Sequence, residues 1–162
     1  KTDKIWTLPR EITKSDRAHH VPLSDMALDI LNDVPMMGDY IFTSAGDRPF
    51  ENFSRAKRIL DSKMKKERAK DDQPPMPDWT LHDLRRTCAS GMARLGITPH
   101  IVEKILNHSS GTIRGVAAIY NRYEYADEMR NALDRWAAHV QKIMTTDNIQ
   151  KSVIRIPKKK SS

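Results

Sequence analysis

Cysteine, glycine and long apolar runs are scarce in this sequence. Cys88 is the single cysteine among 162 residues, so an internal disulfide is impossible. It falls on the apolar side of a predicted helix, which indicates a small core residue in a reducing compartment, and we assign it no chemistry. No stretch approaches the roughly 20 apolar residues that cross a bilayer, and the N-terminus lacks a signal-peptide pattern. We therefore expect an intracellular protein with no membrane partner.

Positive charge is present in excess. The 28 lysines and arginines outnumber the 21 aspartates and glutamates, which gives a formal net charge of +7. This balance favours a polyanionic partner, although charge alone does not separate nucleic acid from acidic proteins or membrane surfaces. Apolar residues make up 38% of the sequence, enough for one ordinary domain with its own core.

The N-terminal region predicts a β-hairpin. Residues 4–11 and 18–23 have the composition of two short strands, and the turn between them carries Lys14 at its tip. A lysine at such a tip is ordinarily no more than a solvated charge. His19 and His20 are adjacent, so they point to opposite faces of the strand and cannot share a metal ion. We interpret both histidines as structural.

Helices are expected after the hairpin. Ser24 and Asp25 can cap a helix, and residues 52–70 form a strongly basic helix whose charge would suit solvent and a DNA backbone equally well. Residues 71–78 contain three prolines and are expected to form a surface connector rather than a domain boundary. The elements together predict an α+β fold that is mainly α-helical, with a small β-hairpin at the N-terminus.

The most informative stretch covers residues 80–120. Its first part should be a helix between Thr80 and Gly96, because apolar residues recur there at steps of three and four. The members of this stripe, which should be buried, are Leu81, Leu84, Cys88, Met92 and Leu95. His82 and Arg85 lie outside the stripe and one helical turn apart, so an imidazole and a guanidinium can reach one anion near the helix start. A phosphate would suit this pair.

A second helix should open at Thr98 and Pro99 and end at Asn107. Its buried face is expected to consist of Ile101, Val102, Ile105 and Leu106. The helix delivers His108 directly after Asn107. Further along, Tyr120 precedes Asn121 and Arg122, so that a tyrosine hydroxyl is offered beside cationic side chains.

Three motifs in this stretch resemble the catalytic half of a tyrosine recombinase of the phage or genomic-island integrase type. They are HDLRRT at residues 82–87, LNH at residues 106–108 and IYNR at residues 119–122, in the family's order and spacing. The resemblance implies that His82, Arg85, His108 and Tyr120 all contact the scissile phosphate. The family usually has glycine before the second histidine, whereas this chain has Asn107, which also tolerates a left-handed turn.

The resemblance also implies a separate role for each of these residues in the reaction. Tyr120 would attack the phosphorus and form a 3′-phosphotyrosine, while Arg85 clamps phosphate oxygens and His82 and His108 add hydrogen bonds. Lys14 matches the hairpin lysine that family members use to protonate the leaving 5′ oxygen. Because the covalent bond conserves the phosphodiester energy, neither a cofactor nor a metal ion is expected.

Family membership would further imply the partners of the protein. These are double-stranded DNA with attachment sites, other subunits in a tetramer on paired sites, and accessory DNA-bending proteins. We expect the protein in the bacterial cytoplasm, associated with the nucleoid and encoded by a prophage or genomic island.

One expected part of the family's site is missing. A further catalytic arginine lies upstream of the lysine hairpin in similar recombinases, and neither Arg10 nor Arg17 matches it. We therefore interpret residues 1–162 as a partial catalytic domain that lacks this arginine segment and the N-terminal core-binding domain. Such a fragment should bind DNA and cleave it poorly or not at all.

The C-terminal region predicts an amphipathic helix from residue 124 to about residue 144. Its apolar stripe should pack on the domain's own core, or else on a neighbouring subunit. Residues 145–162 are expected to form a basic tail, with a short strand over residues 149–156.

Two other functions remain compatible with the sequence. The helices over residues 81–106 could form a helix-turn-helix regulator that binds DNA without cutting it, which leaves His82, His108 and Tyr120 without a role. A type IB topoisomerase would use similar phosphate chemistry without site specificity. The residues of the three motifs favour a recombinase.

Overall fold

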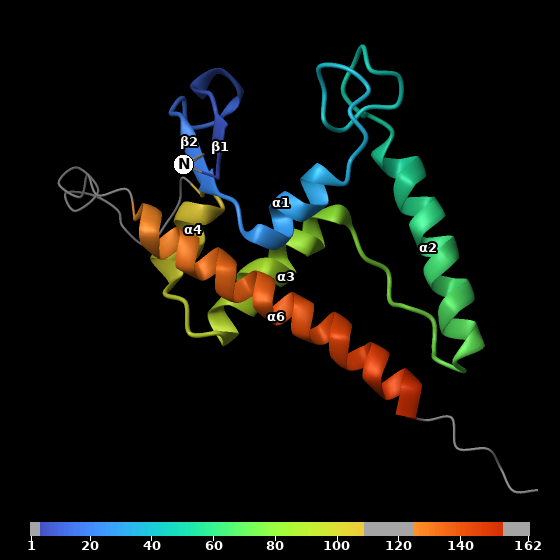
Figure 1. Cartoon of the computed structure of the whole chain (residues 1–162). Helices are drawn as coiled ribbons and strands as arrows, with labels where there is room; N and C mark the ends of the chain where they lie inside the picture. Colours follow the sequence, from blue (N-terminus) through green and yellow to red (C-terminus); the bar gives the residue numbers. More distant parts are fainter. Residues whose placement is uncertain (1–3, 109–124, 154–162) are drawn as a thin grey trace, which may run out of the picture. The chain divides into compact units, whose positions relative to one another are not determined.

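The computed structural model describes residues 4–108 and 125–153. The described elements are β1 (Ile5–Leu8), a short 3-10 helix (Arg10–Ile12), β2 (His19–Pro22), α1 (Asp25–Asn32), α2 (Phe53–Lys70), α3 (Leu81–Arg94), α4 (Pro99–Ile105) and α6 (Ala126–Val153) (Figure 1). The predicted α+β class, mainly helical with a small N-terminal hairpin, is confirmed.

The chain forms two compact units. The first consists of residues 1–28 together with residues 90–162, and the second of residues 29–89. The first unit therefore contains the hairpin, α4 and α6, and the second contains α2 and the connector that leads to α3. The proline-rich connector lies within the second unit, which agrees with its interpretation as a surface connector.

The hairpin pairs β1 with β2 in antiparallel order, from Ile5 opposite Pro22 to Leu8 opposite His19. Both strands are shorter than predicted, and the first of them ends early because a 3-10 turn begins directly after Pro9. The Thr13 hydroxyl closes the connecting turn. It lies 2.7 Å from the Arg17 carbonyl oxygen and 3.3 Å from the Arg17 amide, which donates to it.

The hydrophobic core of the described residues lies in the first unit. Its buried members are Met92, Ile97, Ile101, Val102, Ile105, Met129 and Ala132. Gly96 makes this core possible, because its φ of +75° ends α3 and turns the chain toward α4. The Gly96 amide donates to the Ala93 carbonyl, and the Ile97 amide donates to the Met92 carbonyl. This left-handed cap brings two apolar side chains into the core together.

The apolar stripe of α3 is buried only toward its C-terminal end. Met92 is fully buried, but Leu81 is 43% exposed and Leu84 is 56% exposed. The prediction of a continuous buried face is therefore wrong for the first turn. Helical periodicity reports which side chains share a face, and whether another element covers that face depends on the tertiary structure.

In the second unit, the connector is tied back onto α2 by polar contacts. The Trp79 indole Nε1 donates to Asp61 Oδ1 at 3.0 Å, and Lys57 Nζ lies 2.6 Å from Asp61 Oδ2 and 4.7 Å from the centre of the Trp79 ring. Arg68 Nε donates to the Pro74 carbonyl oxygen at 2.7 Å. These contacts fix the path of the chain immediately before α3.

The C-terminal helix is longer than predicted. Helix α6 continues to Val153. The prediction of a strand over residues 149–156 is therefore wrong for residues 149–153. The helix contains no glycine or proline that would end it. Met129 and Ala132 are buried where α6 packs on α4 and β2, whereas Ile143 and Met144 are exposed. No described helix is long and apolar enough to cross a membrane.

Gly91 permits a close approach between α3 and α6. A Cβ atom at this position would lie 2.1 Å from Cζ3 of Trp136. We expect Gly91→Ala to lower the free energy of unfolding by about 1–3 kcal/mol through overpacking. In an open helix position the same change would raise it by up to about 1 kcal/mol. Urea unfolding measures the difference.

The exposed neighbour Ser90 supplies the matched control, because Ser90→Ala adds no atom against Trp136 and should change stability little. An unfolding free energy for Gly91→Ala at or above that of the unmodified protein would contradict the close packing of Trp136 on α3.

Candidate functional site

The start of α3 is capped by Asp83. Its Oδ2 accepts hydrogen bonds from the Thr80 amide at 2.9 Å and from the Thr80 hydroxyl at 2.8 Å. These bonds, foremost the one from the backbone amide, hold the pKa of the Asp83 carboxyl below its usual value. Asp83 Oδ1 also pairs with Arg86 at 3.2 Å. The Thr-x-x-Asp spacing is a capping-box signal, so this role was accessible from the sequence.

His82 and Arg85 lie on the first turn of α3. The helix predicted to carry them is confirmed, and the two residues are one turn apart on it. His82 is exposed and Arg85 is half-buried. Arg86 pairs with Asp83. The helix start thus presents an imidazole and a guanidinium at neighbouring positions, the arrangement that suits a phosphate.

Cys88 lies one turn beyond Arg85 and is half-buried. Burial raises the pKa of its thiol, and the Arg85 charge offsets this only in part. The thiol is therefore held in its neutral form at physiological pH, which disfavours its use as a nucleophile.

His108 follows a left-handed turn at the end of α4. Asn107 has a φ of +51°, and its amide donates to the Lys104 carbonyl at 3.1 Å. The His108 amide donates to the Glu103 carbonyl at 3.0 Å. This pair of bonds is the Schellman motif, in which asparagine replaces the more common glycine. Asn107 thus tolerates the left-handed turn, as expected, and this turn leaves the His108 side chain exposed.

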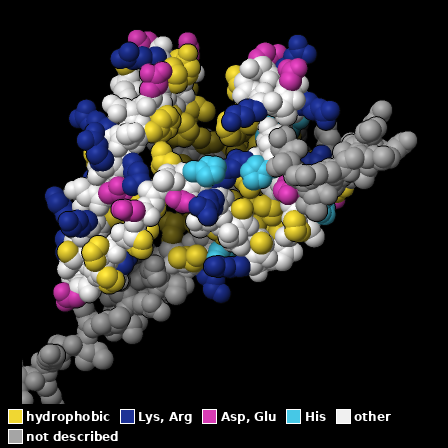
Figure 2. All heavy atoms as spheres, turned by 180° about the vertical axis from the view of Figure 1, so that it is seen from behind, with side chains coloured by type: hydrophobic (Ala, Val, Ile, Leu, Met, Phe, Trp, Pro, Cys, Tyr) yellow, Lys and Arg dark blue, Asp and Glu magenta, His cyan; other side chains and the backbone are white. Residues whose placement is uncertain are grey.

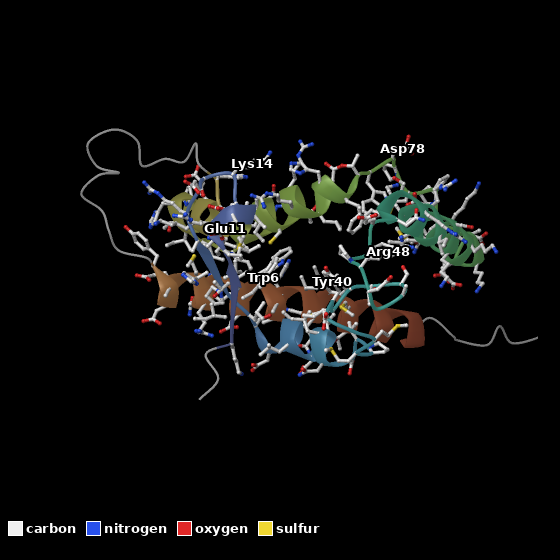
Figure 3. All side chains as sticks on the ribbon, turned by 90° about the horizontal axis from the view of Figure 1, so that it is seen from above. Trp6, Glu11, Lys14, Tyr40, Arg48 and Asp78 are labelled. Carbon is white, nitrogen blue, oxygen red and sulfur yellow. The ribbon has the colours of Figure 1, made fainter. Side chains whose placement is uncertain are left out.

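Lys14 lies in the turn of the hairpin and is exposed (Figure 3). Before Lys14, the Thr13 hydroxyl closes the turn by its hydrogen bond to Arg17. After Lys14, Asp16 has a positive φ of 50°. The Lys14 backbone is thus held by its neighbours while its side chain extends into solvent. A side chain in this position can reach a bound molecule without breaking any contact of the fold.

The predicted site residues are divided between the units. Lys14 and His108 belong to the first unit, and His82 and Arg85 belong to the second. Tyr120 lies outside the described residues. The structure therefore brings His82 together with Arg85, and each unit presents its own pair of candidate groups.

Helix α2 has two faces of different character. One face carries Lys57, Asp61, Met64 and Lys65 and lies against the connector residues, including Trp79. The other has a shallow groove lined by Arg55, Arg58, Ile59, Ser62, Lys63 and Lys66. No hydrogen bond or ion pair within the described ranges engages the four cations of the groove. Lysine and arginine side chains follow one another along α2, on the left of Figure 2.

No metal site is apparent in the part of the chain that the structure describes, where no three histidine, cysteine or acidic side chains gather around a common point. The available chemistry is that of cations, imidazoles and hydrogen-bond donors, which can bind phosphate and transfer protons.

Comparison with known proteins gives one match. The model of the family described as "Phage integrase family" matches residues 1–126, more than three quarters of the chain. The matched range contains Lys14, His82, Arg85, His108 and Tyr120. No curated protein and no solved structure matches the chain.

Proposed function

We propose, from the premise that this chain belongs to the phage integrase family, that its specific activity is DNA strand cleavage and rejoining through Tyr120. Site-specific recombination is the general function of the family, and the proposal concerns the mechanism and the residues. The observation that carries it is the family match over residues 1–126, because this range contains Tyr120 and the four other residues to which the proposal assigns a role.

The proposed step is a transesterification. The Tyr120 hydroxyl oxygen forms a bond to phosphorus as the bond from phosphorus to the 5′ oxygen breaks. The tyrosine gives up its proton, and the leaving 5′ oxygen receives one. The product is a 3′-phosphotyrosine that keeps the energy of the phosphodiester, so that reversal with a new 5′ hydroxyl rejoins a strand.

The other residues stabilise this step. Arg85 and His82, one turn apart on α3, donate hydrogen bonds to the non-bridging oxygens as negative charge develops on them. His108 adds a donor beyond the end of α4. Lys14 supplies the proton to the 5′ oxygen, a role that its exposed position in the hairpin turn permits.

The test is covalent trapping followed by mapping. The protein is incubated with attachment-site DNA nicked near the scissile phosphate, so that the released strand diffuses away. A complex that resists denaturation is then digested and analysed by mass spectrometry. The expected nucleotide adduct is on the peptide that contains Tyr120. An adduct on another residue would refute the assignment.

The trapping is performed with the 162-residue chain and with a version of the protein extended upstream of residue 1. An adduct in the longer protein only would show that groups outside these residues complete the site. Absence of an adduct from both, despite tight DNA binding, would refute the proposed reaction.

The cationic face of α2 is a second part of the proposal. Arg55, Arg58, Lys63 and Lys66 line one groove, and their spacing would allow them to follow a DNA backbone. Lys57, on the opposite face, pairs with Asp61 and thereby helps to hold the connector on α2. We therefore assign phosphate contacts to the groove face.

Replacing Lys63 and Lys66 together by glutamine should weaken DNA binding equally for all sequences. The slope of the logarithm of affinity against the logarithm of salt concentration should fall by about two, because each lost phosphate contact contributes about one. Binding is measured by fluorescence anisotropy at several salt concentrations.

Lys65→Gln combined with Lys70→Gln is the matched control. It removes the same charge from the same helix, but Lys65 lines the connector face and Lys70 pairs with Glu67. This variant should keep the original slope. Equal slopes for both double variants would show that α2 contributes only general charge.

The proposed reaction also requires several subunits to assemble on DNA. Recombination joins two DNA sites, and we propose a tetramer on the paired sites, with DNA-bending proteins as accessories. The exposed Ile143 and Met144 toward the end of α6 supply apolar surface for such contacts. Mass photometry with and without attachment-site DNA measures the subunit number.

A further inference from the structure

The carbonyl groups at the end of α4 are all accounted for. Three of them accept hydrogen bonds from backbone amides. The Val102 carbonyl accepts from the Leu106 amide, the Glu103 carbonyl from the His108 amide and the Lys104 carbonyl from the Asn107 amide. The fourth, the Ile105 carbonyl, has no backbone donor among the described residues. Free carbonyls at a helix end require a donor from elsewhere, especially in a part-buried position.

His19 supplies that donor. Its Nε2 lies 3.2 Å from the Ile105 carbonyl oxygen, across 86 positions of sequence. A carbonyl oxygen only accepts, so Nε2 must carry a hydrogen in this contact. His19 belongs to β2, and Lys14 stands five residues before it in the turn. One side chain therefore joins the hairpin to the helix end from which His108 extends.

The neighbouring histidine does not make such a link. His20 Nδ1 lies 3.1 Å from the Thr7 hydroxyl, its cross-strand neighbour within the hairpin, and it is exposed. The two histidines thus differ in what they connect. His20 joins two strands that already pair through their backbones, whereas His19 joins two elements that share no backbone hydrogen bond.

We propose that His19 is a positioning residue that fixes the end of α4, and with it His108, against the hairpin that carries Lys14. Its effect on cleavage rests on the proposed function, but the link itself does not. Without this bond, the Ile105 carbonyl loses its donor, and the Asn107 turn can open independently of the hairpin. His19 itself does not contact the DNA in this proposal.

Three variants test the link. His19→Leu introduces an apolar side chain of similar size and removes the donor. His19→Gln keeps an N–H group at about the distance of Nε2 and should retain the bond. His20→Leu is the matched control, because it removes a histidine and a hydrogen bond from the same strand without touching α4.

The first measurement is nuclear magnetic resonance of the chain itself. The nitrogen shifts of the His19 ring should report a hydrogen on Nε2. Exchange of the Asn107 and His108 amides should become about tenfold faster in His19→Leu, since loss of one net hydrogen bond has that size. It should remain unchanged in His20→Leu and be restored in His19→Gln.

Each of three results would overturn the proposal: a hydrogen on Nδ1 alone, unchanged exchange in His19→Leu, or equal acceleration in His20→Leu. If His19→Leu fails to fold, His19→Gln decides the matter. The glutamine variant must then keep the slow exchange of Asn107 and His108, and fast exchange in a folded His19→Gln protein refutes the link.

The second measurement compares two DNA substrates, in whichever form of the protein gives the Tyr120 adduct. One has a normal 5′ oxygen and the other a bridging 5′ sulfur, which leaves as a thiolate without needing a proton. Lys14→Ala should slow cleavage of the normal substrate far more than that of the sulfur substrate. His19→Leu should show the same preference to a smaller degree, about tenfold.

The two proposals fail in different ways. If the unmodified protein forms no adduct at Tyr120, the proposed reaction is wrong, while the exchange measurement still decides whether His19 holds α4. If adducts form at Tyr120 and His19→Leu cleaves both substrates as the unmodified protein does, the reaction stands and the positioning role is refuted.

Discussion

The Tyr120→Phe protein is expected to bind attachment-site DNA as tightly as the unmodified protein and to form no covalent adduct. The change removes one oxygen atom, and with it the only nucleophile that the proposed reaction uses. An aromatic ring of the same shape remains, so DNA binding and folding should be preserved. The measurement is a denaturing gel of the trapped complex, with binding followed separately by anisotropy.

Tyr125→Phe is the control for this experiment. The Tyr125 ring packs against His100, with ring centres 5.2 Å apart, and Lys104 Nζ lies 5.7 Å from its ring centre. Phenylalanine keeps the ring that makes both contacts, so adduct formation should continue. An adduct that persists in Tyr120→Phe and disappears in Tyr125→Phe would reassign the nucleophile.

The same experiment separates the competing functions. A helix-turn-helix regulator would bind DNA and act normally with phenylalanine at position 120, and it would form no adduct in any variant. A type IB topoisomerase would form the adduct but would also relax supercoiled DNA that lacks attachment sites. Strong relaxation of such DNA would count against a site-specific recombinase.

Arg85→Ala is expected to slow adduct formation by about a hundredfold to a thousandfold, the usual cost of removing one donor to a developing oxyanion. DNA affinity should fall only slightly, because one phosphate contact among many is lost. Single-turnover cleavage of the nicked substrate at saturating protein measures the rate without a contribution from binding.

Arg86→Ala makes this prediction specific. It removes the same charge from the next position of α3, where the guanidinium is paired with Asp83 and 75% of the side chain is exposed. We expect a cleavage rate within about threefold of the unmodified protein, as for a surface ion pair of small energy. Similar losses in both variants would indicate that local charge, and not the position of Arg85, supports the reaction.

Several features of the fold were predictable because their signals are local. The helix starts at Thr80 and Thr98, the left-handed Asn107 and the hairpin turn all follow from short patterns of caps, turns and spacing. The motifs around His82, His108 and Tyr120 are equally local, and they indicated the family whose model matches residues 1–126.

Other local patterns gave the wrong answer. Residues 149–153 have the composition of a strand start but continue α6, because an existing helix extends at little cost until a breaker ends it. Leu81 and Leu84 belong to an apolar stripe and are nevertheless exposed. A pattern of spacing identifies a face, and it contains no information about what covers the face.

The sequence by itself determined the element types, the order of the motifs and the candidate residues, since each depends on neighbours within a few positions. Only the tertiary structure decided that Trp136 packs on Gly91, that Trp79 and Lys57 share Asp61, and that His19 completes the end of α4. These contacts join residues that are far apart in the chain. Such a contact depends on how the helices and strands pack, and packing leaves no periodic signal in the sequence.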